Sequence, residues 1–113
     1  MPVIKNGIKS IDNVNRSQID VGMKDIKLFN EAIDAVYDER QAQKTLYGRQ
    51  RLSYGDWLKI LIEEVGEVAQ AMQQDEHWSR EEDASDLFNE LIQVAAVSIS
   101  IAEQVLEEME SVK

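Results

Sequence analysis

Apolar side chains recur with the period of an α-helix along most of this chain. Between about Met23 and Leu46 they fall on one helical stripe, which consists of Ile26, Phe29, Ile33, Val36 and Tyr37. Gly48 comes just after this stripe, and glycine is the usual residue at a helix C-terminus. The pattern predicts a first helix over about residues 23–46.

A second helix is predicted over about residues 54–75. Ser53 followed by Asp56 resembles a capping box, which marks a helix start. At about 100° per residue, one apolar side forms the predicted core face. This face contains Leu58, Leu61, Ile62, Val65, Val68, Ala69 and Met72, and it is extended around the helix by Trp57, Ile60 and Ala71.

A third helix is predicted over about residues 80–110, with a break near Ala84-Ser85 as an alternative. Ser79 and Glu82 form its capping box. An unbroken helix of this length would span about 45 Å, which favours packing against another subunit. Its predicted core face contains Leu87, Leu91, Val94, Val97, Ser98, Ile101 and Val105.

These elements predict an all-α fold, an antiparallel helix bundle over residues 23–113. Residues 1–22 contain an Asn-Gly turn between short apolar pieces, so we expect a small hairpin or an arm there. A chain of 113 residues indicates one domain with a limited core, which a homo-oligomer, either a dimer or a tetramer, would complete.

Composition narrows the possible functions. The net charge of −10 argues against binding to a nucleic acid duplex, since such proteins present basic faces. The chain has no cysteine, and His77 is its only histidine, so sites built from several Cys or His residues are excluded. There is no apolar segment long enough to span a membrane and no signal pattern, so we expect a cytoplasmic protein.

Carboxylates interrupt the apolar side of the second helix. Glu63, Glu64 and Glu67 lie within about one and a half turns, and no Lys or Arg occurs between Lys59 and Arg80. Because an unpaired buried charge is very costly, these groups need a compensating partner that the local sequence does not supply. A divalent metal ion would satisfy this need.

The third helix carries a second set of oxygen ligands. Glu90 projects into its apolar face, and Asp86 and Gln93 lie along the flank on neighbouring turns. A site made only of oxygen ligands favours a hard cation, Mg²⁺, with Mn²⁺ as the alternative. The alternative interpretation is that these acids, among 22 acidic residues, are simply solvated.

Two segments carry a resemblance to a known family. The runs E-E-V-G-E-V-A at 63–69 and E-L-I-Q-V-A-A-V at 90–97 resemble the MazG-like branch of the all-α nucleoside triphosphate pyrophosphohydrolases. The stretch from Glu39 to Lys44, together with Gly48 and Trp57, resembles what precedes the first motif in small members. The similarity covers about residues 37–104.

The resemblance implies a helical fold assembled from two or four chains. It also implies Mg²⁺-dependent hydrolysis of nucleoside triphosphates to the monophosphate and pyrophosphate, which clears the nucleotide pool. By position, Glu63, Glu64 and Glu67 match the metal-binding acids of the first motif, and Glu90 matches that of the second. Gln93 stands where the family has Asp, so either Gln93 or Asp86 would complete the ligand set.

Other residues receive roles from the same mechanism. Glu63 and Glu64 would serve catalysis, Glu63 by orienting or deprotonating the attacking water. Lys44, Arg49 and Arg51 either grip the distal phosphates or are solvated loop cations. Trp57, Tyr54 and Trp78 are candidates to stack on a base, and for Trp57 the pattern favours core packing over base contact. His77 is expected to be a loop residue.

Two other functions fit the same residues. The first is a catalytically silent helical oligomer that binds a nucleotide or a protein partner, which Gln93 favours. The second is an acidic interaction module whose glutamates meet a basic partner.

Overall fold

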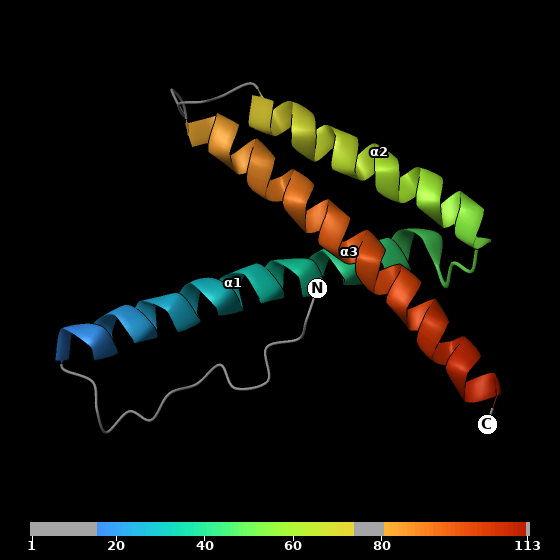
Figure 1. Ribbon diagram of the computed structural model, residues 1–113, viewed down its shortest axis with the longest axis horizontal. Helices are drawn as coiled ribbons and strands as arrows, with labels where there is room; N and C mark the ends of the chain where they lie inside the picture. The colour runs from blue at the N-terminus through green and yellow to red at the C-terminus, as the bar shows by residue number, and fades with distance from the viewer. Residues whose placement is uncertain (1–15, 74–80, 113) are drawn as a thin grey trace. The chain divides into compact units, whose positions relative to one another are not determined.

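The computed structural model describes residues 16–73 and 81–112, which form three helices and contain no strand (Figure 1). The helices are α1 (Arg16–Tyr47), α2 (Tyr54–Gln73) and α3 (Glu81–Ser111). The all-α prediction is therefore confirmed. Residues 1–31 and 32–113 form two separate compact units, and α1 contributes to both. The candidate site residues discussed below all belong to the second unit.

Helix α1 begins earlier than the sequence pattern predicts. It starts at Arg16, so residues 16–22 are helical where a hairpin or arm was expected. Residues 1–15, with the rest of that expected segment, lie outside the described part of the chain. Within the first unit, Lys27 and Glu31 form an exposed ion pair one turn apart, with 3.8 Å between Nζ and Oε1.

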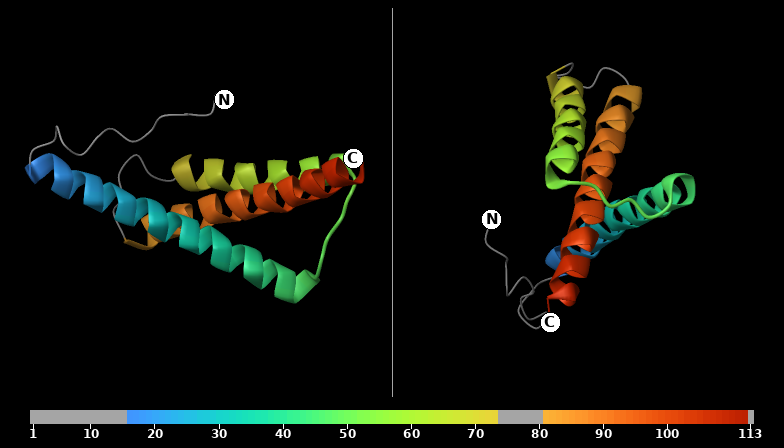
Figure 2. Two further views of the ribbon diagram at one scale, coloured as in Figure 1. Left: turned by 90° about the horizontal axis from the view of Figure 1, so that it is seen from below. Right: turned by 90° about the vertical axis from the view of Figure 1, so that its right-hand side faces the viewer.

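Helices α2 and α3 lie side by side and run antiparallel (Figures 1 and 2). Trp57 and Val68 of α2 are buried in this hairpin, together with Ala96 and Val97 of α3. Helix α3 is continuous from Glu81 to Ser111, so the alternative of a break near Ala84-Ser85 was wrong.

The centre of the predicted core face of α2 is exposed. Leu58, Ile62, Val65 and Met72 expose between 50% and 60% of their surface. The side that packs against α3 is the one that carries Trp57 and Val68, about a quarter of a turn away at 100° per residue. Periodicity identified the apolar positions correctly, but the prediction that Leu58, Ile62, Val65 and Met72 form the core was wrong for a single chain.

Both expected end signals of the loop between α1 and α2 are present. Gly48 has a φ of 67°, and its N–H donates to the Lys44 carbonyl at 2.9 Å, a left-handed C-terminal cap. The Ser53 hydroxyl accepts from the Asp56 N–H at 3.1 Å and caps the N-terminus of α2. The Ser79 box predicted for α3 lies outside the described residues.

The buried side chain of Gln104 joins the loop, α2 and α3. Its Oε1 accepts from Trp57 Nε1 at 2.8 Å and from the Leu52 N–H at 3.1 Å. Its Nε2 donates to the Leu52 carbonyl at 2.8 Å and to Glu108 at 3.3 Å. One amide therefore fixes the start of α2 against α3, and it satisfies a buried indole that would otherwise lose its hydrogen bond.

The C-terminal part of α1 is joined to α3 by a partly buried ion pair. Arg40 donates from Nε and Nη2 to the two carboxylate oxygens of Glu103, at 3.1 and 2.9 Å. The Arg40 side chain is 9% exposed, and two parallel bonds give the pair a defined geometry. This pair sets which side of α1 faces α3.

No helix in residues 16–73 and 81–112 combines the length and hydropathy needed to cross a bilayer.

We predict that Gln104→Ala lowers the free energy of unfolding by about 2–4 kcal/mol, because it leaves the Trp57 indole and the Leu52 backbone groups without partners. Urea unfolding followed by tryptophan fluorescence measures this. Gln70→Ala, an exposed change on α2, is the matched control and should change stability by less than about 0.5 kcal/mol. Equal effects from the two variants would contradict the assigned role of Gln104.

Candidate metal centre and adjoining cleft

Three of the predicted acidic residues converge between α2 and α3. Glu64 and Glu67 lie on successive turns of α2, and Glu90 reaches them from α3. One carboxylate oxygen from each lies within 4.8 Å of the other two. We call these three residues the acidic cluster. Its formation follows from the antiparallel contact, which brings together acids 26 positions apart along the chain, from Glu64 to Glu90.

Glu64 is the most enclosed member of the cluster. Its Oε2 is buried and has no hydrogen-bond partner among the described residues. Loss of solvent raises the pKa of Glu64, and the negative charges of Glu67, Glu63 and Glu39 raise it further. An orphaned carboxylate oxygen in such surroundings calls for a proton or a cation.

The pKa of Glu90 is also raised by its surroundings. A hydrogen bond with Glu67 is the main cause of the raised pKa of Glu90, followed by desolvation and by repulsion from Glu67, Glu64 and Asp86. Ionising carboxylates this close together costs energy because their negative charges repel one another. A bound cation would offset that repulsion.

The cluster fits a hard divalent cation in its ligand chemistry. All its ligand atoms are carboxylate oxygens, which Mg²⁺ and Mn²⁺ prefer. In octahedral coordination at about 2.0–2.1 Å, neighbouring oxygens lie about 2.9 Å apart and opposite ones about 4.2 Å apart. The oxygens of the cluster lie within 4.8 Å of one another, so side-chain rotation would have to bring them closer to bind one ion.

The remaining predicted ligands lie around the cluster. Glu63 is exposed on α2 and acts on Glu64 through its charge, but it does not belong to the converging group. Asp86 is exposed and likewise raises the pKa of Glu90 through its charge. Gln93 is half-buried and lines the same cleft as Glu64. The structure thus assembles three of the predicted ligands and leaves the other three at the edge.

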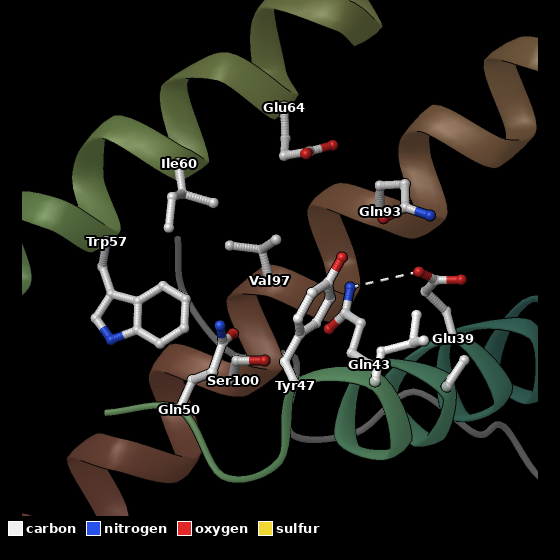
Figure 3. A pocket seen from close by; sticks show the side chains of 12 residues that line it. Glu39, Gln43, Tyr47, Gln50, Trp57, Ile60, Glu64, Gln93, Val97 and Ser100 are labelled. Carbon is white, nitrogen blue, oxygen red and sulfur yellow. Dashed lines mark hydrogen bonds between the residues drawn. The ribbon is translucent and has the colours of Figure 1, made fainter. Parts of the chain in front are cut away.

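A cleft of about 560 Å³ adjoins the acidic cluster and is lined by all three helices (Figure 3). Figure 3 shows Glu64 and Ile60 pointing into it from α2, Gln93 and Val97 from α3, and Tyr47 from α1. The volume lies within the range of small-molecule sites, and the lining combines apolar side chains with a few amides and carboxylates. The cluster therefore stands at one side of a cavity large enough for a ligand.

Two of the three aromatic residues proposed for base stacking have other contacts. Trp57 lines the cleft but is only 3% exposed, and its indole N–H is bonded to Gln104. This favours the core role of Trp57 over stacking. The Tyr54 hydroxyl donates to Glu108, a hydrogen bond that raises the pKa of the tyrosine. Trp78 and His77 lie outside the described residues.

The predicted phosphate-binding cations occupy a separate pocket. Lys44, Arg49 and Arg51 line it with Arg40 and Gly48, and none of these three is among the described residues that line the cleft. Arg49 and Arg51 both pair with Glu107, and these pairs lower the pKa of Glu107. Lys44 Nζ lies 3.8 Å from Glu103. Their role in phosphate binding stays a prediction.

Sequence reasoning did not select the residues that α1 contributes to the cleft. Glu39 lines it and raises the pKa of Glu64, and Gln43 donates to Glu39 at 3.4 Å. A signal was present: Glu39, Gln43 and Tyr47 continue the helical stripe of Val36 towards the end of α1. Polar residues that continue an apolar stripe are candidates to line a cavity.

Comparisons of this chain with protein-family models, with curated proteins and with solved structures found no match.

We predict that the stability of the metal-free protein depends on pH through the cluster. The folded-state pKa values of Glu64 and Glu90 are raised. Their contribution to the free energy of unfolding is therefore fully present below the ordinary glutamate pKa, and it is lost as the pH rises through the raised values. In EDTA, Glu64→Gln should therefore gain stability relative to the wild type between pH 4 and pH 7. Urea unfolding at several pH values measures the difference in unfolding free energy between the variant and the wild type. A difference that does not change with pH would contradict the prediction.

We also predict that Mg²⁺ raises the melting temperature. At a Mg²⁺ concentration a hundred times its dissociation constant, binding to the folded state raises the free energy of unfolding by about 2.7 kcal/mol. Glu90→Gln should reduce it strongly, whereas Glu110→Gln, an exposed acid near the end of α3, should not. Thermal melts with Mg²⁺ and with EDTA make the comparison, and a wild type indifferent to Mg²⁺ would exclude the metal centre.

Proposed function

We propose that this protein is a Mg²⁺-dependent nucleoside triphosphate pyrophosphohydrolase that releases the monophosphate and pyrophosphate. One observation carries the proposal: Glu64, Glu67 and Glu90 converge, and a buried oxygen of Glu64 has no hydrogen-bond partner within residues 16–73 and 81–112. The sequence resemblance and the adjoining cleft support the same function. Clearance of the cytoplasmic nucleotide pool is the role that such an activity would serve.

In this proposal Glu64, Glu67 and Glu90 hold the metal, with Gln93 or Asp86 available as a further oxygen ligand. The chemistry that Mg²⁺ supplies in such sites is neutralisation of phosphate charge and a lower pKa for the attacking water. Without this neutralisation, the carboxylates of the cluster, with Glu63 and Glu39 nearby, would repel a triphosphate. The excess of negative charge therefore makes nucleotide binding conditional on the cation.

The chain's own residues supply orientation. Glu63 is exposed beside the cluster, where its carboxylate can accept a proton from a water on the solvent side. The nucleoside part would occupy the cleft, where Tyr47 and Val97 offer apolar surface and Gln43 offers an amide that can hydrogen-bond a base or sugar. The Lys44, Arg49 and Arg51 pocket remains the candidate for the distal phosphates, provided their pairs with Glu103 and Glu107 open.

The second candidate function is nucleotide binding without hydrolysis, and Gln93 is the observation that favours it. An amide in place of a carboxylate removes one negative charge from the ligand set, which weakens affinity for a hard cation. Gln93 faces the same cleft as Glu64, so its identity bears directly on the site.

Product analysis tests the proposal. The purified protein is incubated with a panel of nucleoside triphosphates and Mg²⁺, and formation of monophosphate and pyrophosphate is followed. Glu64→Gln and Glu90→Gln should each lower the rate of hydrolysis by more than about 100-fold. Replacing a residue that only supports a metal ligand already costs up to about 100-fold in activity, and loss of a ligand itself should cost more. Glu63→Gln should lower the rate while leaving stabilisation by Mg²⁺ in place.

Glu110→Gln, which removes one exposed charge of α3 outside the cluster, should retain the wild-type rate. Full activity in Glu64→Gln would refute the assigned site. Binding of a triphosphate without formation of monophosphate, for every member of the panel, would favour the silent alternative.

A further inference from the structure

The cleft beside the acidic cluster contains a carboxylate that the cluster does not use, that of Glu39 on α1. Glu39 is half-buried, and no Lys or Arg is among the described residues that line the cleft. Its neighbour Arg40 is bonded to Glu103 instead. Because a partly buried charge without partners is costly, the Glu39 carboxylate needs hydrogen-bond donors, and a ligand in the cleft could supply them.

The side chain of Gln43 supplies one donor and fixes what the pair offers to a ligand. Gln43 Nε2 donates to Glu39 Oε1 at 3.4 Å, at the long end of the range for such bonds. An ionised carboxylate only accepts, so the NH₂ group of the amide must be the end beside Glu39. The second hydrogen of that NH₂ group is left for a ligand. Glu39 and Gln43 thus present one donor next to two acceptors (Figure 3).

The other walls of the cleft suit the faces of a flat ring. Ile60 of α2 and Val97 of α3 are apolar, and Tyr47 lies one turn beyond Gln43 on the same side of α1. Bases bind with their faces against apolar or aromatic side chains and their edges against polar groups. Since Glu39 and Glu64 line the same cleft, one nucleotide can reach both the polar pair on α1 and the acidic cluster.

Guanine is the base whose pairing edge complements a donor followed by two acceptors. Along this edge guanine presents the O6 acceptor, the N1–H donor and the amino donor on C2. Gln43 would donate to O6, and the two oxygens of Glu39 would accept from N1–H and from the amino group. Two parallel bonds to one carboxylate give both affinity and a defined geometry.

The other common bases complement the pair less well. Adenine and cytosine each place a single amino donor beside a ring-nitrogen acceptor, so they would use only one oxygen of Glu39. In uracil and thymine the ring N–H lies between two carbonyl oxygens. One of these oxygens would face the carboxylate, and repulsion between two acceptors discriminates against such a base.

We propose that Glu39, with Gln43 beside it, makes guanine nucleotides the preferred substrate class of this cleft. The proposal rests on the proposed function for the hydrolysis itself, whereas the base preference also applies to binding alone. Glu39 lies on α1, outside the acidic cluster, and determines specificity without taking part in the reaction. Its negative charge disfavours any triphosphate, and the two donors of guanine offset that cost most fully.

The first test uses the unaltered protein and three purine nucleotides. GTP, inosine triphosphate and xanthosine triphosphate share O6 and N1–H, and at C2 they carry an amino group, a hydrogen and an oxygen respectively. With Mg²⁺, kcat/KM for GTP should exceed that for inosine triphosphate at least about tenfold and should be lowest for xanthosine triphosphate. Hydrolysis of all three with equal kcat/KM would overturn the inference and leave the pyrophosphohydrolase proposal standing.

Glu39→Gln should shift the preference towards xanthine. The new amide can accept from N1–H and donate to the oxygen on C2, but it cannot accept from both donors of guanine. The ratio of kcat/KM for xanthosine triphosphate to that for GTP should rise at least about 100-fold over the wild type, about tenfold from each base. Any effect of the lost charge on phosphate binding cancels in this ratio. An unchanged ratio, whatever the absolute rates, would overturn the inference.

Asp38→Asn is the matched control. Asp38 is exposed next to Glu39, and it is not among the described residues that line the cleft. The variant removes the same charge and should keep the wild-type ratio. A change in the ratio of GTP to deoxy-GTP on Glu39→Gln, without a change between bases, would place the sugar at Glu39 and also overturn the inference.

Binding measurements separate this inference from the proposed function. If no triphosphate is hydrolysed, the proposed function fails, and the base preference is then read from calorimetric titration with GTP and inosine triphosphate in Mg²⁺. The dissociation constant for GTP should be at least about tenfold lower. Equal constants, or no binding of either nucleotide, would overturn the inference.

Discussion

The antiparallel contact between α2 and α3 is the constraint on which the site depends. Glu64 and Glu67 belong to one helix and Glu90 to the other, so their oxygens approach within 4.8 Å only while the helices keep their register. Gln104 holds that register from the far end, because its amide bonds both the Trp57 indole and the Leu52 backbone. A neutral hydrogen-bond network thus supports the approach of groups that repel one another.

The repulsion itself gives the site its chemical character. Burial and like charge raise the pKa of Glu64, and a hydrogen bond to Glu67 does the same for Glu90. The ionised form of such groups is unfavourable, and a bound cation would stabilise it. Glu110, by contrast, is exposed on α3 outside the cluster. Position in the fold, and not acidity alone, distinguishes the acidic cluster from a surface charge.

Much of this arrangement could be predicted from the sequence, because helix periodicity and end signals are local. Gly48 and Ser53 marked the ends of α1 and α2 correctly, and the acids among apolar residues identified Glu64 and Glu90 as neighbours. Pairing over long distances could not be predicted: Arg51 meets Glu107, 56 positions away, and so belongs to a pocket apart from the cleft. Periodicity also cannot say which apolar side meets which partner, and for this reason Ile62 and Val65 were assigned to the core of one chain.

The ion pair of Arg40 with Glu103 has a consequence for the neighbouring residue. Successive side chains on a helix point about 100° apart, so the docking of Arg40 on α3 turns Glu39 towards the cleft. The orientations of Arg40 and Glu39 are therefore linked through the rotation of α1 about its own axis. Rolling α1 in either direction would weaken the bidentate pair and simultaneously change the negative potential around Glu64. The electrostatics of the acidic cluster are in this way tied to the seating of a helix that contributes none of its three carboxylates.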